Sequence, residues 1–485
     1  MPAEWFIWVL ARLILGAAII VMIIRTMAAA KKAAKPDAAD VKERPEAAQR
    51  LSEAIKIKSI SNEDESKVDW QAFEDFRHFL KKRYPNIHSR MTLDIVGGYS
   101  LFYSLEGSDP SLKPVLLMGH MDVVPEGDEE NWQHPPFSGR IADGYIWGRG
   151  AIDMKGIVVA IFEALEEKLS NGDAPQRGIC VALGHNEETA HESGAIETAK
   201  MLKDRGYEFE FIMDEGGAFM DGAQFGADGV FGLIGLCEKG YSDIRIIARS
   251  NGGHASRPPK NTAAGEVARA VCNLEKRPME ARLTPVVRSM IESMGPAMRF
   301  PFNVMAANLW LFAPVFKHKL SKSRLGNAFI RTTSAVTMLS GSSQANVLPD
   351  VADAVINARL LPGDSTEDVI RHIAKRAAGL EIEPITLNAA SPSADVGHYG
   401  YKQAAKALEY ATGCRVAPYI MTGGTDSRFY QSLSDCVIRC TPFVSYKDDG
   451  HTMHAANERL EISSFYMGIE FYSRLIKKCC YEVEK

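Results

Sequence analysis

The sequence predicts an α/β fold into which a second, α+β domain is inserted. Two observations lead to this prediction. Apolar strand-like runs alternate with amphipathic helical segments from residue 47 to 236 and again after residue 390, as in an open α/β sheet. Between them the segments follow the order βαββαβ of a ferredoxin-like split βαβ sandwich. We therefore expect four parts, which are residues 1–45, 46–236, 237–390 and 391–485.

The composition is that of an ordinary globular protein. The 485 residues are 46% hydrophobic and 24% charged, and the net charge is -5 at pH 7. Without a basic run beyond the N-terminal region, nucleic acid is not expected as a partner. The eight cysteines lack C-x-x-C spacing, so they indicate core thiols in a reducing compartment rather than a zinc knuckle or a disulfide framework: Cys180, Cys237, Cys272, Cys414, Cys436, Cys440, Cys479 and Cys480.

The N-terminal part, residues 1–45, predicts a membrane segment followed by a tether. Trp5 to Ile24 is apolar except for Arg12, and twenty residues are about what a helix needs to cross a bilayer. A signal peptide cleaved between Ala28 and Ala30 is the alternative, although Arg25 disfavours it. The positive-inside rule places the following domain in the cytoplasm, because basic residues follow the span: Arg25, Lys31, Lys32 and Lys35.

The apolar run that begins at Pro114 ends in two polar groups, His120 and Asp122. Side chains alternate along a strand, so both groups leave the sheet on one face. Asp122 can hold one imidazole nitrogen and leave the other free for zinc. The alternative is a hydrogen-bonded pair without a metal ion.

Acidic groups follow three further elements of the predicted sheet domain. Asp153 precedes an amphipathic helix, for which it could also be the N-cap. Glu187 and Glu188 follow an apolar strand, where a cation would relieve their repulsion, although a solvated loop is the alternative. Asp214 ends the next strand. Because open α/β sheets gather ligands at the carboxyl ends of their strands, we expect these groups to lie together.

Two histidines lie in segments distant from that sheet edge. His254 follows two glycines in a turn of the inserted domain, and His454 returns near the C-terminus. Residues 278–327, rich in Met, Arg and aromatic residues, interrupt the inserted domain between its first helix and second strand. This interruption carries no clear motif.

Seven motifs carry most of these groups: His120-Met-Asp122, Gly148-Arg-Gly-Ala-Ile-Asp153-Met-Lys-Gly156, Glu187-Glu188, Asp214-Glu-Gly-Gly217, Gly253-His254-Ala-Ser256, Gly424-Thr-Asp-Ser-Arg-Phe-Tyr430 and His454-Ala-Ala-Asn-Glu458. Together they resemble the M20 family of di-zinc metallopeptidases, in the branch of carboxypeptidase S and the N-fatty-acyl-amino acid hydrolases. The resemblance implies a zinc-peptidase α/β catalytic domain with an inserted lid or dimerisation domain. Asn186 stands where the family usually has Asp, immediately before the implied ligands.

The resemblance also implies two zinc ions per chain. It assigns one ion to His120 and Asp214 and the other to Glu188 and His454, with Asp153 bridging the two. Three carboxylates and two imidazoles would neutralise most of the charge of two zinc ions and leave room for a shared water.

Catalytic and substrate roles follow from the same resemblance. Glu187 is implied as general base, Asp122 as the group that orients the metal-binding imidazole, and His254 as the lid residue at the oxyanion. In dimeric relatives that histidine comes from the partner subunit, so a homodimer through the lid is expected. The residues implied to bind substrate are Asn346, Arg359, Thr425 and Arg428. The alternatives are ordinary strand positions for the first two, a helix cap for Thr425 and an ion pair for Arg428.

Two function classes fit these residues. The first is a zinc hydrolase that cleaves an amide bond next to a free carboxylate, as a peptide carboxypeptidase or an N-acyl-amino acid amidohydrolase. An aminoacylase or dipeptidase is its nearest variant. The second is a non-catalytic metal-binding sensor on the same scaffold. Glu187 favours the enzyme, because a sensor has no need of a free base beside the metal. The family's lumenal and secreted members offer an extracytoplasmic location as the alternative to the cytoplasm.

Overall fold

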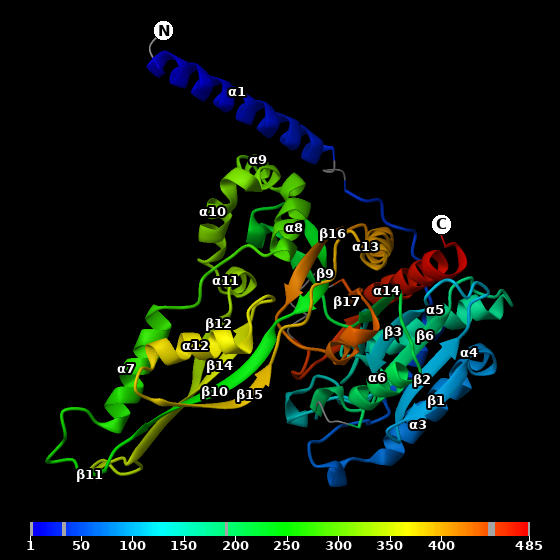
Figure 1. Ribbon diagram of the computed structural model, residues 1–485. Helices are drawn as coiled ribbons and strands as arrows, with labels where there is room; N and C mark the ends of the chain where they lie inside the picture. The colour runs from blue at the N-terminus through cyan, green and yellow to red at the C-terminus, as the bar shows by residue number, and fades with distance from the viewer. Residues whose placement is uncertain (1–2, 32–34, 190–192, 445–451, 484–485) are drawn as a thin grey trace.

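A nine-stranded mixed sheet forms the centre of the larger unit in the computed structural model, which describes residues 3–31, 35–189, 193–444 and 452–483 (Figure 1). Eight of its strands follow the order β1-β2-β6-β3-β7-β17-β9-β16, and β8 pairs with β9 at the side. The bounds are β1 Thr92–Val96, β2 Ser100–Leu105, β3 Val115–His120, β6 Ile179–Gly184, β7 Phe211–Asp214, β8 Ala218–Asp221, β9 Val230–Glu238, β16 Arg415–Met421 and β17 Val437–Arg439.

The middle of this sheet is parallel and buried on both faces. β3 pairs in parallel with β6 and β7, and β17 pairs in parallel with β7. Leu117 belongs to the core shared with helix α5, whereas its neighbours Leu116 and Met118 belong to a separate core with helix α6. This alternation requires a helical layer on each face, which explains why β3 and β6 are continuous apolar runs. The α/β fold predicted from the sequence is confirmed.

Helices cover both faces of the large sheet. Helices α2, α4, α5 and α14 share one core, and α6 with the 3₁₀ helix η6 covers the other face. A small sheet of β18, β5 and β4 stands beside that edge. The bounds are α2 Pro45–Ile55, α3 Trp70–Arg83, α4 Pro85–Arg90, β4 Ile141–Ala142, β5 Tyr145–Trp147, α5 Lys155–Ser170, α6 Ala195–Asp204, α13 Tyr399–Thr412, η6 Asp426–Leu433, β18 Arg459–Glu461 and α14 Ile462–Ile476.

The inserted domain has a sheet and a core of its own. Its strands follow the antiparallel order β12-β14-β10-β15, and with α7 and α12 the chain order is βαββαβ, as the sequence predicts. Two short strands, β11 and β13, pair at the far end of this domain (Figure 1). The bounds are β10 Gly240–Arg249, β11 Gly253–His254, α7 Ala263–Lys276, β12 Thr333–Ser340, β13 Val347–Leu348, β14 Val351–Leu360, α12 Thr366–Arg376 and β15 Glu381–Asn388.

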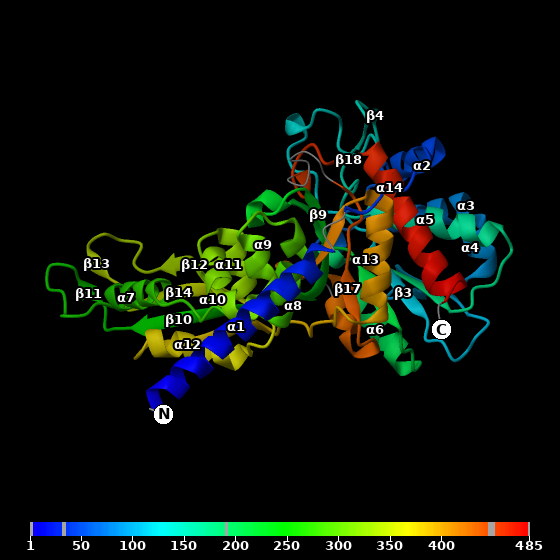
Figure 2. The same ribbon diagram turned by 90° about the horizontal axis from the view of Figure 1, so that it is seen from above.

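The interruption at residues 278–327 forms helices that pack on the larger unit. Val287, Met290, Ile291 and Phe329 belong to the same core as β9 and β16, not to the core of the inserted sheet. These helices therefore belong to the large domain by packing, although in sequence they lie between two elements of the inserted domain (Figure 2). Their bounds are α8 Pro285–Met294, α9 Phe302–Ala307, α10 Leu309–Leu320 and α11 Arg324–Ile330.

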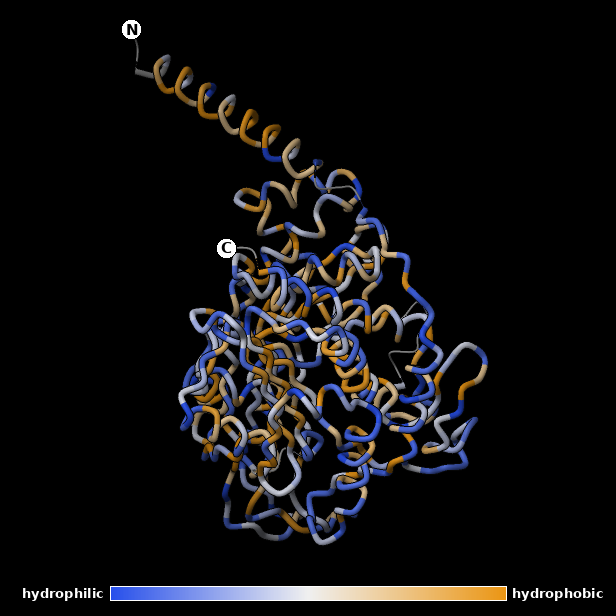
Figure 3. Tube along the Cα trace, turned by 90° about the vertical axis from the view of Figure 1, so that its right-hand side faces the viewer, coloured by the Kyte–Doolittle hydropathy of each residue, from blue (hydrophilic) through white to orange (hydrophobic). Residues whose placement is uncertain are grey.

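The N-terminal helix α1, Ala3–Ala30, projects away from the rest of the molecule (Figure 3). Residues Trp5–Ala30 form a helix long and apolar enough to cross a membrane, and none of its most apolar stretch is buried inside the protein. A membrane anchor and a signal sequence both have this character.

Candidate metal centre

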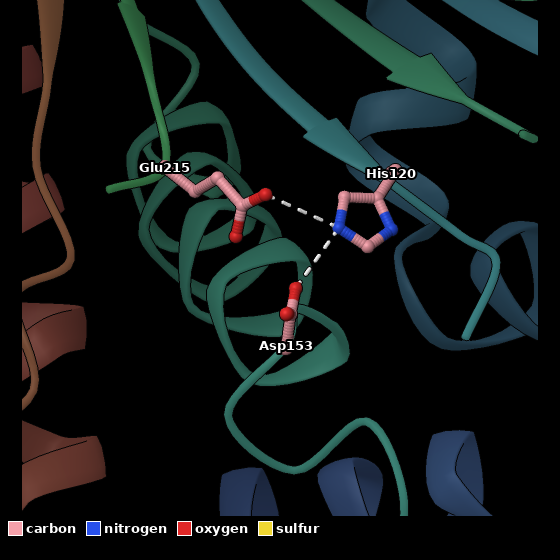
Figure 4. A group of neighbouring side chains, drawn as sticks. All are labelled: His120, Asp153 and Glu215. Carbon is pink, nitrogen blue, oxygen red and sulfur yellow. Dashed lines mark hydrogen bonds and ion pairs between the residues drawn. The ribbon is translucent and has the colours of Figure 1, made fainter. Parts of the chain in front are cut away.

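His120, the last residue of β3, points its imidazole into a group of carboxylates. Its Nε2 lies 3.0 Å from Asp153 Oδ1 and 3.3 Å from Glu215 Oε1 (Figure 4). Its Nδ1 lies 3.0 Å from the backbone oxygen of Asp122 and 3.3 Å from Asp122 Oδ1. One imidazole nitrogen is thus held by Asp122, and the other faces the carboxylates, which is how a metal-binding histidine is oriented.

Asp153 joins two groups of side chains. Its Oδ1 contacts His120, and its Oδ2 lies 3.0 Å from Nε2 of His454. Helix α5 begins at Lys155 with Met154 at the N-cap position and without a side-chain cap. The N-cap alternative for Asp153 is therefore wrong, because both carboxylate oxygens face histidines instead of the helix.

Glu188 and His454 complete the second group. Glu188 Oε2 lies 3.1 Å from His454 Nε2, while Glu188 Oε1 is buried and lacks a hydrogen-bond partner among the residues that the structure describes. A buried carboxylate oxygen without a partner is costly unless a cation or water satisfies it. The unpaired oxygen of Glu188 therefore favours a bound cation at this site.

Two sets of possible ligand atoms result, each within 4.8 Å: His120, Asp153 and Glu215 in one, and Asp153, Glu188 and His454 in the other. Imidazole nitrogens and carboxylate oxygens suit zinc, and Asp153 offers one oxygen to each set. The donor chemistry therefore fits a pair of divalent metal ions bridged by one carboxylate.

The electrostatics of this edge point the same way. Burial raises the pKa of Glu187 and Glu215 well above their usual range, and neighbouring carboxylates raise both further. Hydrogen bonds to Asp153 and Glu188 raise the pKa of His454 to about 10. Buried carboxyl groups whose charged forms are disfavoured lie here beside two imidazoles, and a bound cation would stabilise such a site.

Asp214 is not part of either set. Its Oδ1 accepts a hydrogen bond from the backbone N–H of Glu215 at 2.8 Å, and its Oδ2 accepts one from Ser427 N–H at 2.8 Å. The structure thus brings Glu215 to His120 in the place that the sequence analysis gave to Asp214. Adjacent residues at a strand end point to opposite sides, so only one of the two can reach the cluster.

Asp122 also positions the Glu187-Glu188 pair. Its Oδ1 accepts from the N–H of Glu187 at 3.2 Å, and its Oδ2 accepts from the N–H of Glu188 at 3.1 Å and from Ser61 Oγ at 2.7 Å. Glu188 consequently faces His454. Glu187 stays outside both ligand sets, although the charges of His120 and Glu215 act on its carboxyl group.

The residues that the sequence analysis placed in the inserted domain lie at its two opposite ends. His254 and Asn346 are exposed beside the β11–β13 pair, where His254 Nδ1 lies 2.8 Å from Ser256 Oγ. That pair stands at the opposite end of the inserted domain from β3 (Figures 1 and 2). Arg359 lies at the other end of β14, with its guanidinium 4.5 Å from the centre of the Tyr241 ring.

Thr425 and Arg428 follow β16 but differ in accessibility. Thr425 is buried, and its hydroxyl donates to Glu238 Oε1 at 2.7 Å instead of capping η6. Arg428 is exposed and stacks 4.6 Å from the centre of the Phe429 ring. Of the two, only Arg428 presents its polar group to the surface.

Three further acidic residues support this edge, and the sequence analysis assigned none of them to the site. Glu458 accepts from Arg149 and from the N–H of Ile152, which holds the loop before Asp153. Glu238 accepts from Arg439 Nε and Thr425, and Asp426 lies buried with a pKa that burial and Asp214 raise to about 8. Glu458 stood within a motif, whereas Glu238 and Arg439 are 201 positions apart and carry no local signal.

Comparisons with known proteins show which family the chain resembles. Residues 116–478 match the family model described as peptidase family M20/M25/M40. A probable carboxypeptidase S-like 2 of Dictyostelium discoideum is 38% identical over 441 residues, covering 89% of this chain and 85% of the relative. The N-fatty-acyl-amino acid synthase/hydrolase PM20D1 of Xenopus tropicalis is 34% identical over 443 residues, covering 90% and 86%.

Solved structures share the fold. The M20 family metallo-carboxypeptidase Sso-CP2 of Sulfolobus solfataricus superposes with a TM-score of 0.63 at 17% identity and covers 89% of this chain and 98% of its own. At that identity the likeness concerns the fold alone.

Proposed function

The chain belongs to peptidase family M20/M25/M40 and is a metal-dependent hydrolase; we propose that it cleaves an amide bond adjacent to a free carboxylate. The observation that carries this proposal is the position of Glu187, which lies beside the two ligand sets that share Asp153 but belongs to neither of them. A non-catalytic sensor would need the ligands but not an unengaged carboxyl group next to them. The enzyme is therefore favoured over a sensor on the same scaffold.

We assign two zinc ions to the two ligand sets. His120, Asp153 and Glu215 would hold one, and Asp153, Glu188 and His454 the other. Glu215 replaces Asp214 in this assignment, because both oxygens of Asp214 accept backbone hydrogen bonds. Zinc ions bound there would polarise the scissile carbonyl group and lower the pKa of a shared water toward neutrality.

Asp122 and Glu187 have separate roles in the proposed reaction. Asp122 fixes the ring of His120 and, through two backbone N–H groups, the direction of Glu187 and Glu188. Glu187 takes the proton of the attacking water and passes it to the leaving amine, so that the amine departs neutral.

The substrate class follows from charge and from relatives. A free carboxylate next to the amide needs a cation, and Arg428 and Arg359 are the cationic candidates among the predicted substrate residues. The names of the relatives, a carboxypeptidase S-like protein and an N-fatty-acyl-amino acid synthase/hydrolase, support a peptide or an N-acyl amino acid as substrate. An aminoacylase or dipeptidase activity is the nearest alternative.

Helix α1 is proposed as a retained single-pass anchor. Basic residues after the span favour a cytoplasmic catalytic domain, and all eight free cysteines agree with a reducing compartment. A lumenal or secreted domain is the alternative, and protease treatment of sealed vesicles distinguishes the two. The lid is proposed to pair with that of a second copy, which would bring His254 of the partner subunit to this site.

Metal content and substrate range test the proposal directly. We expect about two zinc ions per folded chain and, after chelation, loss of hydrolysis that returns when zinc is added. A panel of N-acyl amino acids, their amidated counterparts and dipeptides should show cleavage only where the carboxylate is free. A reproducible stoichiometry of one or less in fully loaded protein, or equal cleavage of the amidated compounds, would contradict it.

A further inference from the structure

The helices of residues 278–327 leave a group of large apolar side chains in solvent. Phe300 is 81% exposed, and on the first turns of α10 Trp310 is 51%, Leu311 47% and Val315 40% exposed. Leu311 and Val315 are four positions apart and share one face of the helix, with Trp310 beside them. We call the three residues on α10, Trp310, Leu311 and Val315, the α10 patch. A cluster of this kind marks a protein or membrane contact more often than free surface.

The patch is tied to the C-terminal end of α1. Arg25 Nε donates to the backbone oxygen of Ala307 at 2.9 Å, and Asn308 Nδ2 donates to Thr26 Oγ1 at 3.2 Å. Ala307 and Asn308 stand immediately before α10. Figures 1 and 2 show α1 leaving the molecule over α9 and α10. The membrane segment and the patch therefore meet at one place.

The length of α1 fixes how deep this meeting point lies. Its 26-residue apolar stretch spans about 39 Å at 1.5 Å per residue. The hydrocarbon core of a bilayer is about 30 Å thick, so the last turns of α1 reach the headgroup region. Arg25 and Thr26 stand in those turns, which places Ala307, Asn308 and the start of α10 at the same depth. Tryptophan is enriched at that level of a membrane.

The charges around the patch suit a lipid surface. Lys317, His318 and Lys322 follow Val315 on α10 and in the turn after it. Basic side chains that flank apolar ones can extend to phosphate groups while their stems remain in the interface. A second protein would match the apolar group as well, but it would not explain why the group lies where α1 enters the membrane.

We propose that the α10 patch inserts into the interface of the bilayer that α1 crosses, so that the catalytic domain is held against the membrane at a second point. The proposal rests on α1 being a membrane segment, and it gives the interruption at residues 278–327 a function. The large core on which α8 and α11 pack would then transmit the orientation of α10 to the sheet that carries the metal site.

Site-directed labels in the full-length protein test this contact. Of the eight cysteines only Cys272 is exposed, so a Cys272→Ser background accepts single new cysteines. Val315→Cys reports the patch, Leu13→Cys reports α1, and Leu339→Cys on the inserted sheet is a matched surface control; Leu13 and Leu339 are both 66% exposed. Each variant carries a small fluorophore and is reconstituted in phosphatidylcholine/phosphatidylserine vesicles that contain chain-nitroxide lipid.

We expect the labels at 13 and 315 to be quenched by the nitroxide lipid and the label at 339 to be unaffected. Quenching at 13 without quenching at 315 overturns the proposal while α1 remains a membrane segment. Absence of quenching at both positions overturns the anchor as well. A label at 315 that is shielded from aqueous iodide but not quenched by lipid indicates a protein partner, including a second copy, and also overturns the proposal.

Discussion

Active-site residues were predicted in two regions, the carboxyl edge of the large sheet and the β11–β13 end of the inserted domain, which we call the lid tip. A single chain brings the predicted residues together at the sheet edge but not at the lid tip. At the edge, His120, Asp153 and Glu188 lie buried or nearly so, and hydrogen bonds fix their directions. At the tip, His254 and Asn346 are exposed and distant from that edge. A rigid parallel sheet collects ligands at one edge within a chain, whereas an inserted domain can deliver its residues only by closing or by pairing with another copy.

The largest expected effect tests the edge alone. Glu187→Gln keeps the size and hydrogen bonding of the side chain but removes the proton acceptor, so turnover should fall by roughly two to four powers of ten. Zinc content should stay unchanged. Metal analysis and initial rates on the same preparation measure both.

Glu188→Gln is the matched control, one position away. It removes a ligand oxygen beside His454, so zinc should be lost and activity should partly return with excess zinc, which does not happen for Glu187→Gln. If the two variants exchange these behaviours, the roles of base and ligand are exchanged. If Glu187→Gln retains full activity, water activation lies elsewhere.

The second effect tests whether the tip belongs to the partner's site. His254→Ala should reduce kcat by about two to three powers of ten if the imidazole binds the oxyanion, because one such donor contributes that much. Zinc content should be normal, since His254 is remote from both ligand sets. Mixing His254→Ala with Glu187→Gln should then restore activity.

The amount restored separates the two arrangements. In a mixed dimer one site combines an intact Glu187 with the partner's His254, so random exchange should recover about a quarter of the wild-type sites. Recovery that does not exceed the sum of the two variants would show that His254 acts within its own chain or not at all. In the first case His254 could reach the metal site only by closure of the inserted domain, without a second copy.

The same contrast explains what the sequence could and could not predict. The order of strands and helices follows from local apolar patterns, and the grouping of His120, Asp153 and Glu188 follows from their places at one edge of the predicted sheet, whereas His454 joins them only through the family resemblance. Where residues 278–327 pack depends on contacts with β16, far along the chain, which no local pattern contains. The burial of Thr425 depends likewise on Glu238.

A finer limit applies at the end of β7. The sequence offers two neighbouring carboxylates, Asp214 and Glu215, and alternation excludes one of them from the cluster without saying which. The backbone after the strand decides, because Ser427 N–H and Glu215 N–H both turn toward Asp214. Asp214 thereby becomes a support for the loop after β16, and Glu215 becomes the candidate ligand.

The smallest expected effect tests that distinction. Glu215→Gln should weaken zinc binding at the set with His120 by roughly two powers of ten, with activity returning at high zinc, whereas Asp214→Asn should leave zinc affinity within about tenfold. Because an amide has only one acceptor oxygen and cannot accept both backbone hydrogen bonds equally well, Asp214→Asn should instead lower the unfolding temperature. Zinc titration and thermal denaturation of both variants give the answer. Loss of zinc affinity in Asp214→Asn with normal affinity in Glu215→Gln would restore Asp214 as the ligand and would require the loop at Ser427 to rearrange when the metal binds.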